Sequence, residues 1–170
     1  MDRATFAGLC VLTFLVPWDN TVAFAGLGSL SRLAGAGTLG LGLASVLTNQ
    51  RVKRPHLFLV IAGAFVVWSA LALLWTTNLP ATEERVLTYL QVLLLSWLIW
   101  QYARTEERLH RLLIAYVLGA YVPALDTIKN YVQGANFFGI GRYTASGFNP
   151  NEIAFILALG IPVAWYLTLL

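Results

Sequence analysis

Long apolar stretches alternate with short polar segments along the whole of this 170-residue chain. A helix needs about 20 mostly apolar residues to cross the hydrocarbon core of a bilayer. The three clearest stretches of roughly that length contain no charged residue and are 57–75, 86–103 and 153–170. With three weaker stretches, the pattern predicts about six transmembrane helices, over residues 4–25, 33–50, 57–75, 86–103, 112–131 and 151–170.

The second stretch, 33–50, is uncharged but rich in glycine, at Gly35, Gly37, Gly40 and Gly42. Small residues let two helix backbones approach each other closely inside a membrane. We therefore expect this span to pack tightly against its neighbours through its glycines.

The first stretch, 4–25, is interrupted by Pro17 and Asp19 and has two interpretations. Residues 23–25 resemble a signal-peptidase site, and Arg3 resembles the charged start of a signal peptide. However, Pro17 and Asp19 break the apolar region, and Asp2 cancels the charge of Arg3. We favour a kinked first span over a cleaved signal peptide, and both interpretations leave the later topology unchanged.

The composition supports a membrane protein, since 58% of the residues are hydrophobic, 11% are charged and the mean hydropathy is +0.70. Soluble domains usually carry about a quarter charged residues. The net charge of +3 comes from short basic clusters between apolar stretches. Such clusters are typical of cytoplasmic loops, and there is no basic stripe with interleaved aromatic residues that would bind nucleic acid. The predicted fold class is therefore an all-α polytopic transmembrane helical bundle.

Lysine and arginine in short loops predict the orientation of the chain. The segment after 33–50 contains Arg51, Lys53 and Arg54, and the segment after 86–103 contains Arg104, Arg108 and Arg111. Both segments should face the cytoplasm, which places the N-terminus inside and residues 130–149 outside. Residues 105–111 should extend a helix into the interface, because Glu107 and Arg111 form a favourable pair four residues apart.

The residue types most often used in catalysis and metal binding are sparse. Cys10 is the single cysteine and is expected to be a small buried hydrophobic residue rather than a reactive thiol. His56 and His110 lie beside the basic clusters on the predicted cytoplasmic side. No Cys/His cluster has metal-ligand spacing, so we predict no metal and no cofactor.

The most informative segment is 134–152, which leads into the last span. Asn149 suits a helix N-cap, Pro150 suits the first helical position, and Glu152 at the third can close a capping box. The last helix should therefore begin sharply at Pro150. Its free N–H groups and the planar guanidinium of Arg142 would suit a phosphate group.

Two interpretations of Arg142 stay open on physical grounds alone. It binds the phosphate of a lipid substrate on the outer leaflet, together with Asn149 and Asn151, or it extends to ordinary lipid phosphates as interfacial arginines do.

Asp126 and Lys129, three residues apart, are expected to neutralise each other at the outer end of 112–131. Asp19 and Arg32 are expected to pair in the same way.

The sequence resembles the O-antigen ligase and polymerase family of bacteria. The resemblance rests first on Arg142 followed by Ser146-Gly147-Phe148-Asn149-Pro150-Asn151, and then on the motifs 153–154 and 157–162. Weaker similarity is found in 28–35, 68–71, 74–75 and 116–121. The resemblance runs over essentially the whole chain.

This resemblance implies a multi-pass protein of the bacterial inner membrane, a C-type glycosyltransferase. Such enzymes take a glycan from a polyprenyl diphosphate carrier at the periplasmic face. They pass it to lipid A–core, to another glycan or to a similar acceptor, without a nucleotide sugar or a metal. The expected partners are membrane lipids and the polyprenyl diphosphate-linked glycan, and Arg142 would hold the diphosphate.

The chain also departs from that family, whose members have about ten to twelve spans and a large periplasmic loop in the second half. We therefore expect an N-terminal part of a longer protein, whose missing C-terminal half carries the catalytic loop; no catalytic residue is assigned here. The alternative is a truncated or non-enzymatic membrane scaffold or partner subunit. A part of a transporter is a third, weaker possibility, because no internal repeat is evident.

Overall fold

The computed structural model describes residues 2–21, 23–24, 28–49, 52–135 and 141–169. Within these ranges the chain is almost entirely helical, which confirms the predicted all-α class. The six α-helices are α1 (Asp2–Leu15), α2 (Leu30–Asn49), α3 (Leu57–Leu71), α4 (Leu79–Tyr102), α5 (Glu106–Val132) and α6 (Pro150–Thr168). The remaining elements are the 3₁₀ helices η1 (Val16–Thr21) and η2 (Ala72–Leu74) and the paired two-residue strands β1 (Ala23–Phe24) and β2 (Gly28–Ser29).

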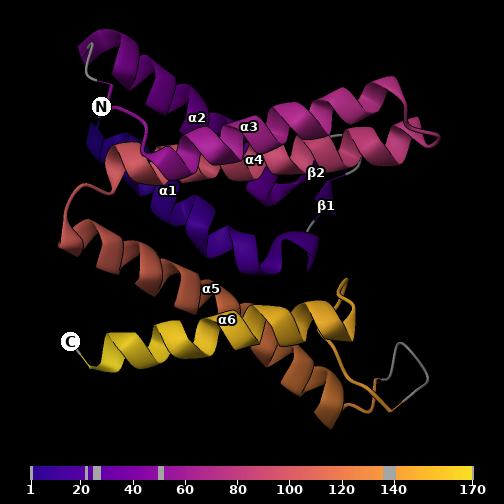
Figure 1. Cartoon of the computed structure of the whole chain (residues 1–170). Helices are drawn as coiled ribbons and strands as arrows, with labels where there is room; N and C mark the ends of the chain where they lie inside the picture. The colour runs from indigo at the N-terminus through magenta and orange to yellow at the C-terminus, as the bar shows by residue number, and fades with distance from the viewer. Residues whose placement is uncertain (1, 22, 25–27, 50–51, 136–140, 170) are drawn as a thin grey trace.

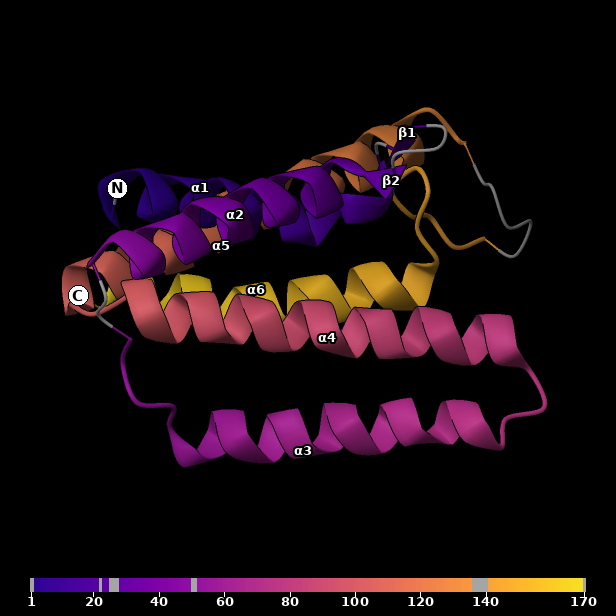
Figure 2. The same cartoon turned by 90° about the horizontal axis from the view of Figure 1, so that it is seen from above.

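The helices run back and forth along a common direction (Figures 1 and 2). The N-terminus, the C-terminus and the connections α2–α3 and α4–α5 lie at one end. The strands β1 and β2 and the connections α3–α4 and α5–α6 lie at the other end. We call the first the basic end, for its residues Arg3, Lys53, Arg54, Arg104, Arg108 and Arg111, and the second the loop end.

Four of the described helical segments are long and apolar enough to cross a membrane: Leu30–Thr48, Leu57–Leu74, Glu106–Val132 and Pro150–Thr168. The other two helices differ for simple reasons. α1 has 14 residues, fewer than the roughly 17 that a span requires. α4 has 24 residues but carries Glu83, Glu84 and Arg85 in its first two turns.

The first helix is shorter than the predicted span 4–25. The α-helix ends at Leu15 and continues as the 3₁₀ helix η1, in which Trp18 has non-helical dihedral angles. Pro17 explains the change, because a proline in a helix lacks the N–H donor and clashes with the preceding turn. The Trp18 indole N–H instead donates to the Phe14 carbonyl, at 2.9 Å. Ala25 of the alternative signal-peptide site lies outside the described residues.

The other helices cover the apolar stretches that were predicted as spans. Two of them also begin earlier, in the polar residues before the apolar stretch. α4 begins seven residues before 86, because Asn78 caps it and Pro80 occupies its first turn. α5 begins six residues before 112, where Thr105 caps it. The predicted Glu107–Arg111 pair is confirmed, with an N–O distance of 2.6 Å. α5 also continues through Pro123 to Val132.

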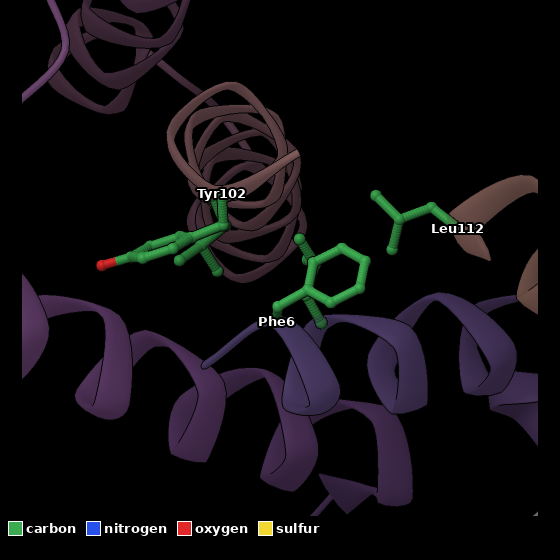
Figure 3. Packing of buried hydrophobic residues seen from close by; sticks show 5 residues of the cluster. Phe6, Tyr102 and Leu112 are labelled. Carbon is green, nitrogen blue, oxygen red and sulfur yellow. The ribbon is translucent and has the colours of Figure 1, made fainter. Parts of the chain in front are cut away.

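The main core joins α1, α2, α4 and α5. Five buried residues form it, and Figure 3 shows Phe6 between Tyr102 and Leu112, with the Tyr102 hydroxyl directed away from both. The hydroxyl group of Tyr102 donates to the Gly42 carbonyl at 2.7 Å, which joins α4 to α2. This bond satisfies a phenol in an apolar core, where an unpaired hydroxyl would be costly.

Some glycines lie where two helices come very close together, but not all the glycines of 33–50 do so. A Cβ added at Gly42 would lie 2.8 Å from a methyl carbon of Leu98, and one at Gly119 would lie 2.1 Å from the Phe14 carbonyl oxygen. The expected packing of 33–50 through its glycines is therefore confirmed at Gly42. Gly37 and Gly40 instead face open space.

α3 exposes a long apolar surface that is suited to a bilayer. It packs against α4 and lies at the edge of the bundle (Figure 2). Most of its large side chains are exposed, including Phe58, Ile61, Phe65, Val67 and Trp68. In water such a continuous apolar surface would favour association, whereas lipid chains would solvate it.

Candidate functional site

The start of α6 has the predicted capping arrangement. The Asn149 side chain accepts a hydrogen bond from the Asn151 N–H at 2.8 Å, and Glu152 accepts one from the Asn149 N–H at 3.0 Å. These bonds close a capping box, with Pro150 in the first turn. The predicted sharp start at Pro150 is confirmed. The Asn149 side-chain oxygen is occupied by the cap, so only its amide N–H₂ remains for a ligand.

The substitution Asn149→Ala should lower the free energy of unfolding by about 1 kcal/mol, as for other lost N-caps. The reason is that one helix N–H would lose its acceptor. Unfolding of the protein in detergent by a denaturant titration measures the change. Asn151→Ala is the matched control, because Asn151 contributes its backbone N–H to the cap and its side chain is exposed. Equal losses in the two variants would contradict the role of the cap.

The segment leading to this cap is attached to the end of α5. The Ser146 N–H donates to Asp126 at 2.7 Å, and the buried Asn130 side chain donates to the Thr144 carbonyl at 2.9 Å. The ring of Tyr131 meets that of Tyr143 edge-on, with 5.0 Å between the ring centroids. Three contacts from the last two turns of α5 therefore hold residues 143–146.

Turn geometry explains the path of this segment. The Phe148 N–H donates to the Ala145 carbonyl at 3.1 Å, and Gly147 between them has a φ of 82°. A positive φ at the third position is characteristic of a type II turn and favours glycine. Below the turn, Ala145, Phe148 and Ile153 form a small buried cluster with Ile156 and Leu157. The turn thus packs against the apolar residues at the start of α6.

α5 ends with an equally specific turn at Gly134. The Ala135 N–H donates to the Asn130 carbonyl at 2.9 Å, and the Gly134 N–H donates to the Tyr131 carbonyl at 3.1 Å. With a φ of 67° at Gly134, this is a Schellman motif, the common C-terminal cap of helices. It directs the chain away from α5 at a defined point. The following residues 136–140, including Gly139 of the glycine-rich segment, lie outside the described residues.

Arg142 lies exposed in this anchored segment, beside Gly141. Within the described part of the chain it has no ion-pair partner. The neighbouring acids are engaged elsewhere, since Asp126 accepts from the Ser146 N–H and pairs with Lys129 at 3.5 Å. Glu152 is held by the cap. Arg142 is therefore the cation of this junction that is left for an external anion.

The predicted pairing of Asp126 with Lys129 is confirmed, but it describes only part of the role of Asp126. The carboxylate also anchors the loop through Ser146. The predicted pair of Asp19 and Arg32 is wrong for the described residues, because Asp19 accepts a hydrogen bond from the Ser31 hydroxyl instead.

Sequence reasoning missed Asn130 and Thr144. Both are buried, and the Thr144 hydroxyl donates to the Phe148 carbonyl at 3.0 Å. A signal for Asn130 was present, because it follows Asp126 by four residues and so shares its helical face. No comparable signal marks Thr144, since its role depends on the path of the loop.

A shallow hollow lies at the loop end. It has a volume of about 300 Å³ and is lined by residues from the starts of α2 and α4, namely Arg32, Pro80, Glu83, Glu84, Leu87, Thr88 and Gln91. Carboxylate, hydroxyl, amide and guanidinium groups in one hollow are suited to a ligand with many hydroxyl groups.

Comparison with known proteins gives no match: no family model, no curated protein and no solved structure is significantly similar to this chain.

Proposed function

We propose that this chain is the N-terminal membrane part of a glycosyltransferase similar to the O-antigen ligases and polymerases of bacteria. It would cross the inner membrane six times, with α1 and η1 together as the first span and α4 as the fourth. The whole enzyme would transfer a glycan from polyprenyl diphosphate at the periplasmic face. The acceptor would be lipid A–core, another glycan or a similar molecule.

The distribution of charge supports this orientation. The basic end carries six described basic residues against three acidic ones, Asp2, Glu106 and Glu107. The loop end carries four basic residues (Arg32, Arg85, Lys129 and Arg142) against five acidic ones (Asp19, Glu83, Glu84, Asp126 and Glu152). An excess of lysine and arginine in short loops favours the cytoplasm. The loop end, with Arg142, then faces the periplasm.

One observation carries the proposal, namely that Arg142 has no ion-pair partner among the described residues and lies on an anchored loop that leads into a capped helix. In glycan transfer from polyprenyl diphosphate the sugar–phosphate bond breaks and the diphosphate leaves with both electrons of that bond. The enzyme must orient the acceptor and stabilise the departing negative charge. The guanidinium of Arg142 suits this second task, because its planar fork matches phosphate oxygens.

A general base for the acceptor hydroxyl would have to come from another part of the enzyme. The two histidines of the chain, His56 and His110, belong to the basic end. There His56 contacts Trp100 and His110 contacts Tyr166, with centroid separations of 5.3 and 6.1 Å. Neither lies at the end that carries Arg142. This chain would therefore supply the diphosphate site, and the C-terminal half would supply the base.

In the full-length enzyme, Arg142→Ala should reduce glycan transfer at least tenfold, because the leaving diphosphate loses its cation. Arg142→Lys should retain part of the activity, since a lysine keeps the charge but not the fork. Transfer from a purified polyprenyl diphosphate glycan in vitro measures both variants. Arg85→Ala, an exposed arginine at the same end, is the control and should keep near-normal activity. Transfer by Arg142→Ala within a factor of two of the unmodified enzyme would refute the assignment.

A further inference from the structure

A group of exposed basic residues lies at the basic end, opposite the loop end that carries Arg142. There the linker between α2 and α3 is held against the end of α4. The Lys53 N–H donates to the Gln101 side chain at 2.9 Å, and the Trp100 indole N–H donates to the Arg54 carbonyl at 3.0 Å. The Lys53 ammonium also lies 3.7 Å from the centroid of the Trp100 ring. The linker therefore presents its cations from a defined position.

Arg104 joins the same group from the end of α4. Its Nε donates to the Gln101 carbonyl at 2.7 Å, so Gln101 contacts both Arg104 and the Lys53 backbone. Lys53, Arg54 and Arg104 are exposed and have no ion-pair partner among the described residues.

Two other arginines near the end of α4, Arg111 and Arg108, have contacts of their own. Arg111 pairs with Glu107, and Arg108 donates to the Tyr102 carbonyl at 2.9 Å while its guanidinium lies 5.0 Å from the centroid of the Phe6 ring. Among the described residues, the exposed cations that the linker and the end of α4 present are thus Lys53, Arg54 and Arg104.

A cavity of about 480 Å³ opens beside these cations, between the start of α1 and the ends of α2 and α4. It is lined by Asp2, Ser45, Val46, Thr48, Gln101, Tyr102 and Arg104. Its volume lies within the range of about 300 to 1,000 Å³ typical of small-ligand sites. The one carboxylate in its wall, Asp2, accepts a hydrogen bond from the Ser45 hydroxyl at 2.6 Å. Arg104 supplies a cation to the same wall.

We propose that this cavity, with Lys53 and Arg54 at its side, binds the phosphate headgroup of an anionic phospholipid. Basic pockets between transmembrane helices at the cytoplasmic side are suited to anionic headgroups. Trp100 is of the residue type that gathers at the headgroup level of a bilayer. The exposed Leu43 and Leu47 on α2 provide an apolar path for the acyl chains. This proposal does not depend on the transferase function, because it concerns the other end of the bundle.

The thermal unfolding of the purified full chain in neutral detergent tests the proposal. Phosphatidylglycerol should raise the unfolding temperature Tm more than phosphatidylcholine does, because the two lipids share acyl chains but differ in charge. Arg104→Gln and Lys53→Gln should each lose at least half of this difference, measured from the Tm of each variant without lipid. Arg32→Gln, an exposed cation at the loop end, is the control and should retain it.

Three results would overturn the proposal. The first is an equal shift of Tm with the two lipids. The second is a full phosphatidylglycerol effect in both Arg104→Gln and Lys53→Gln. The third is a shift of the same size with inorganic phosphate alone, which would show a site for free phosphate rather than for a lipid headgroup.

Discussion

Gly119→Ala should destabilise the protein by about 3 kcal/mol, at the upper end of the range for overpacking. The added Cβ would lie 2.1 Å from the Phe14 carbonyl oxygen, far inside van der Waals contact. That oxygen belongs to the backbone of α1 and also accepts the Trp18 indole N–H, so it cannot move aside easily. The helices α1 and α5 would have to separate. The midpoint of unfolding in a denaturing detergent titration measures the loss.

Gly37→Ala and Gly40→Ala are the matched controls for this prediction. Both glycines lie in the helix α2, and a Cβ added at either one meets nothing within 4 Å. Replacing glycine by alanine in a helix favours the helix by up to about 1 kcal/mol in water. The controls should therefore be neutral or slightly stabilising. A Gly119→Ala variant as stable as the controls would show that α1 and α5 do not cross at Gly119.

Asn130→Ala should lower the free energy of unfolding by about 2 kcal/mol, because it leaves the buried Thr144 carbonyl without a donor. If Arg142 holds the diphosphate, the same variant should also reduce glycan transfer by the full-length enzyme. The reason is that the segment bearing Arg142 would lose its buried attachment to α5. Denaturant titration and the transfer assay measure the two effects separately.

Gln133→Ala provides the control, since Gln133 lies at the same end of α5 but its side chain is exposed. It should change neither stability nor transfer by a large factor. Normal transfer in a clearly destabilised Asn130→Ala variant would separate the fold of the loop from the function of Arg142. Unchanged stability in Asn130→Ala would contradict the role of the buried amide in holding the loop.

Much of the helical architecture is predictable from apolar runs and caps. Thr105, Asn149 and Pro150 mark the starts of two helices, because capping is decided by residues within one turn. Pro17 marks the place where α1 stops being a regular helix, for an equally local reason. The polar start of α4 was missed, because the criterion was hydropathy, whereas a helix can continue beyond the apolar core of a membrane. The polar start of α5 was expected from the pair of Glu107 and Arg111.

The candidate site is predictable only in part. The cap of α6 follows from the sequence 149–152, and the exposed Arg142 was chosen for the chemistry of its side chain. The attachment of the loop through Asp126, Asn130 and Thr144 was not predicted. These residues lie 14 to 20 positions apart along the chain in their hydrogen-bonded pairs, and local spacing does not show which carbonyl or N–H each side chain reaches.

The sequence by itself determined that this is a helical membrane protein, where most helices lie, and how α6 begins. Those features depend on hydropathy and on contacts within one helical turn. The tertiary structure alone decided that Gly42 and Gly119 make close contacts while Gly37 and Gly40 do not. It alone also showed that Asp126 and Asn130 hold the loop of Arg142, and that Lys53 and Arg104 meet at Gln101. These features depend on which helices become neighbours, and that choice is made by packing between distant parts of the chain.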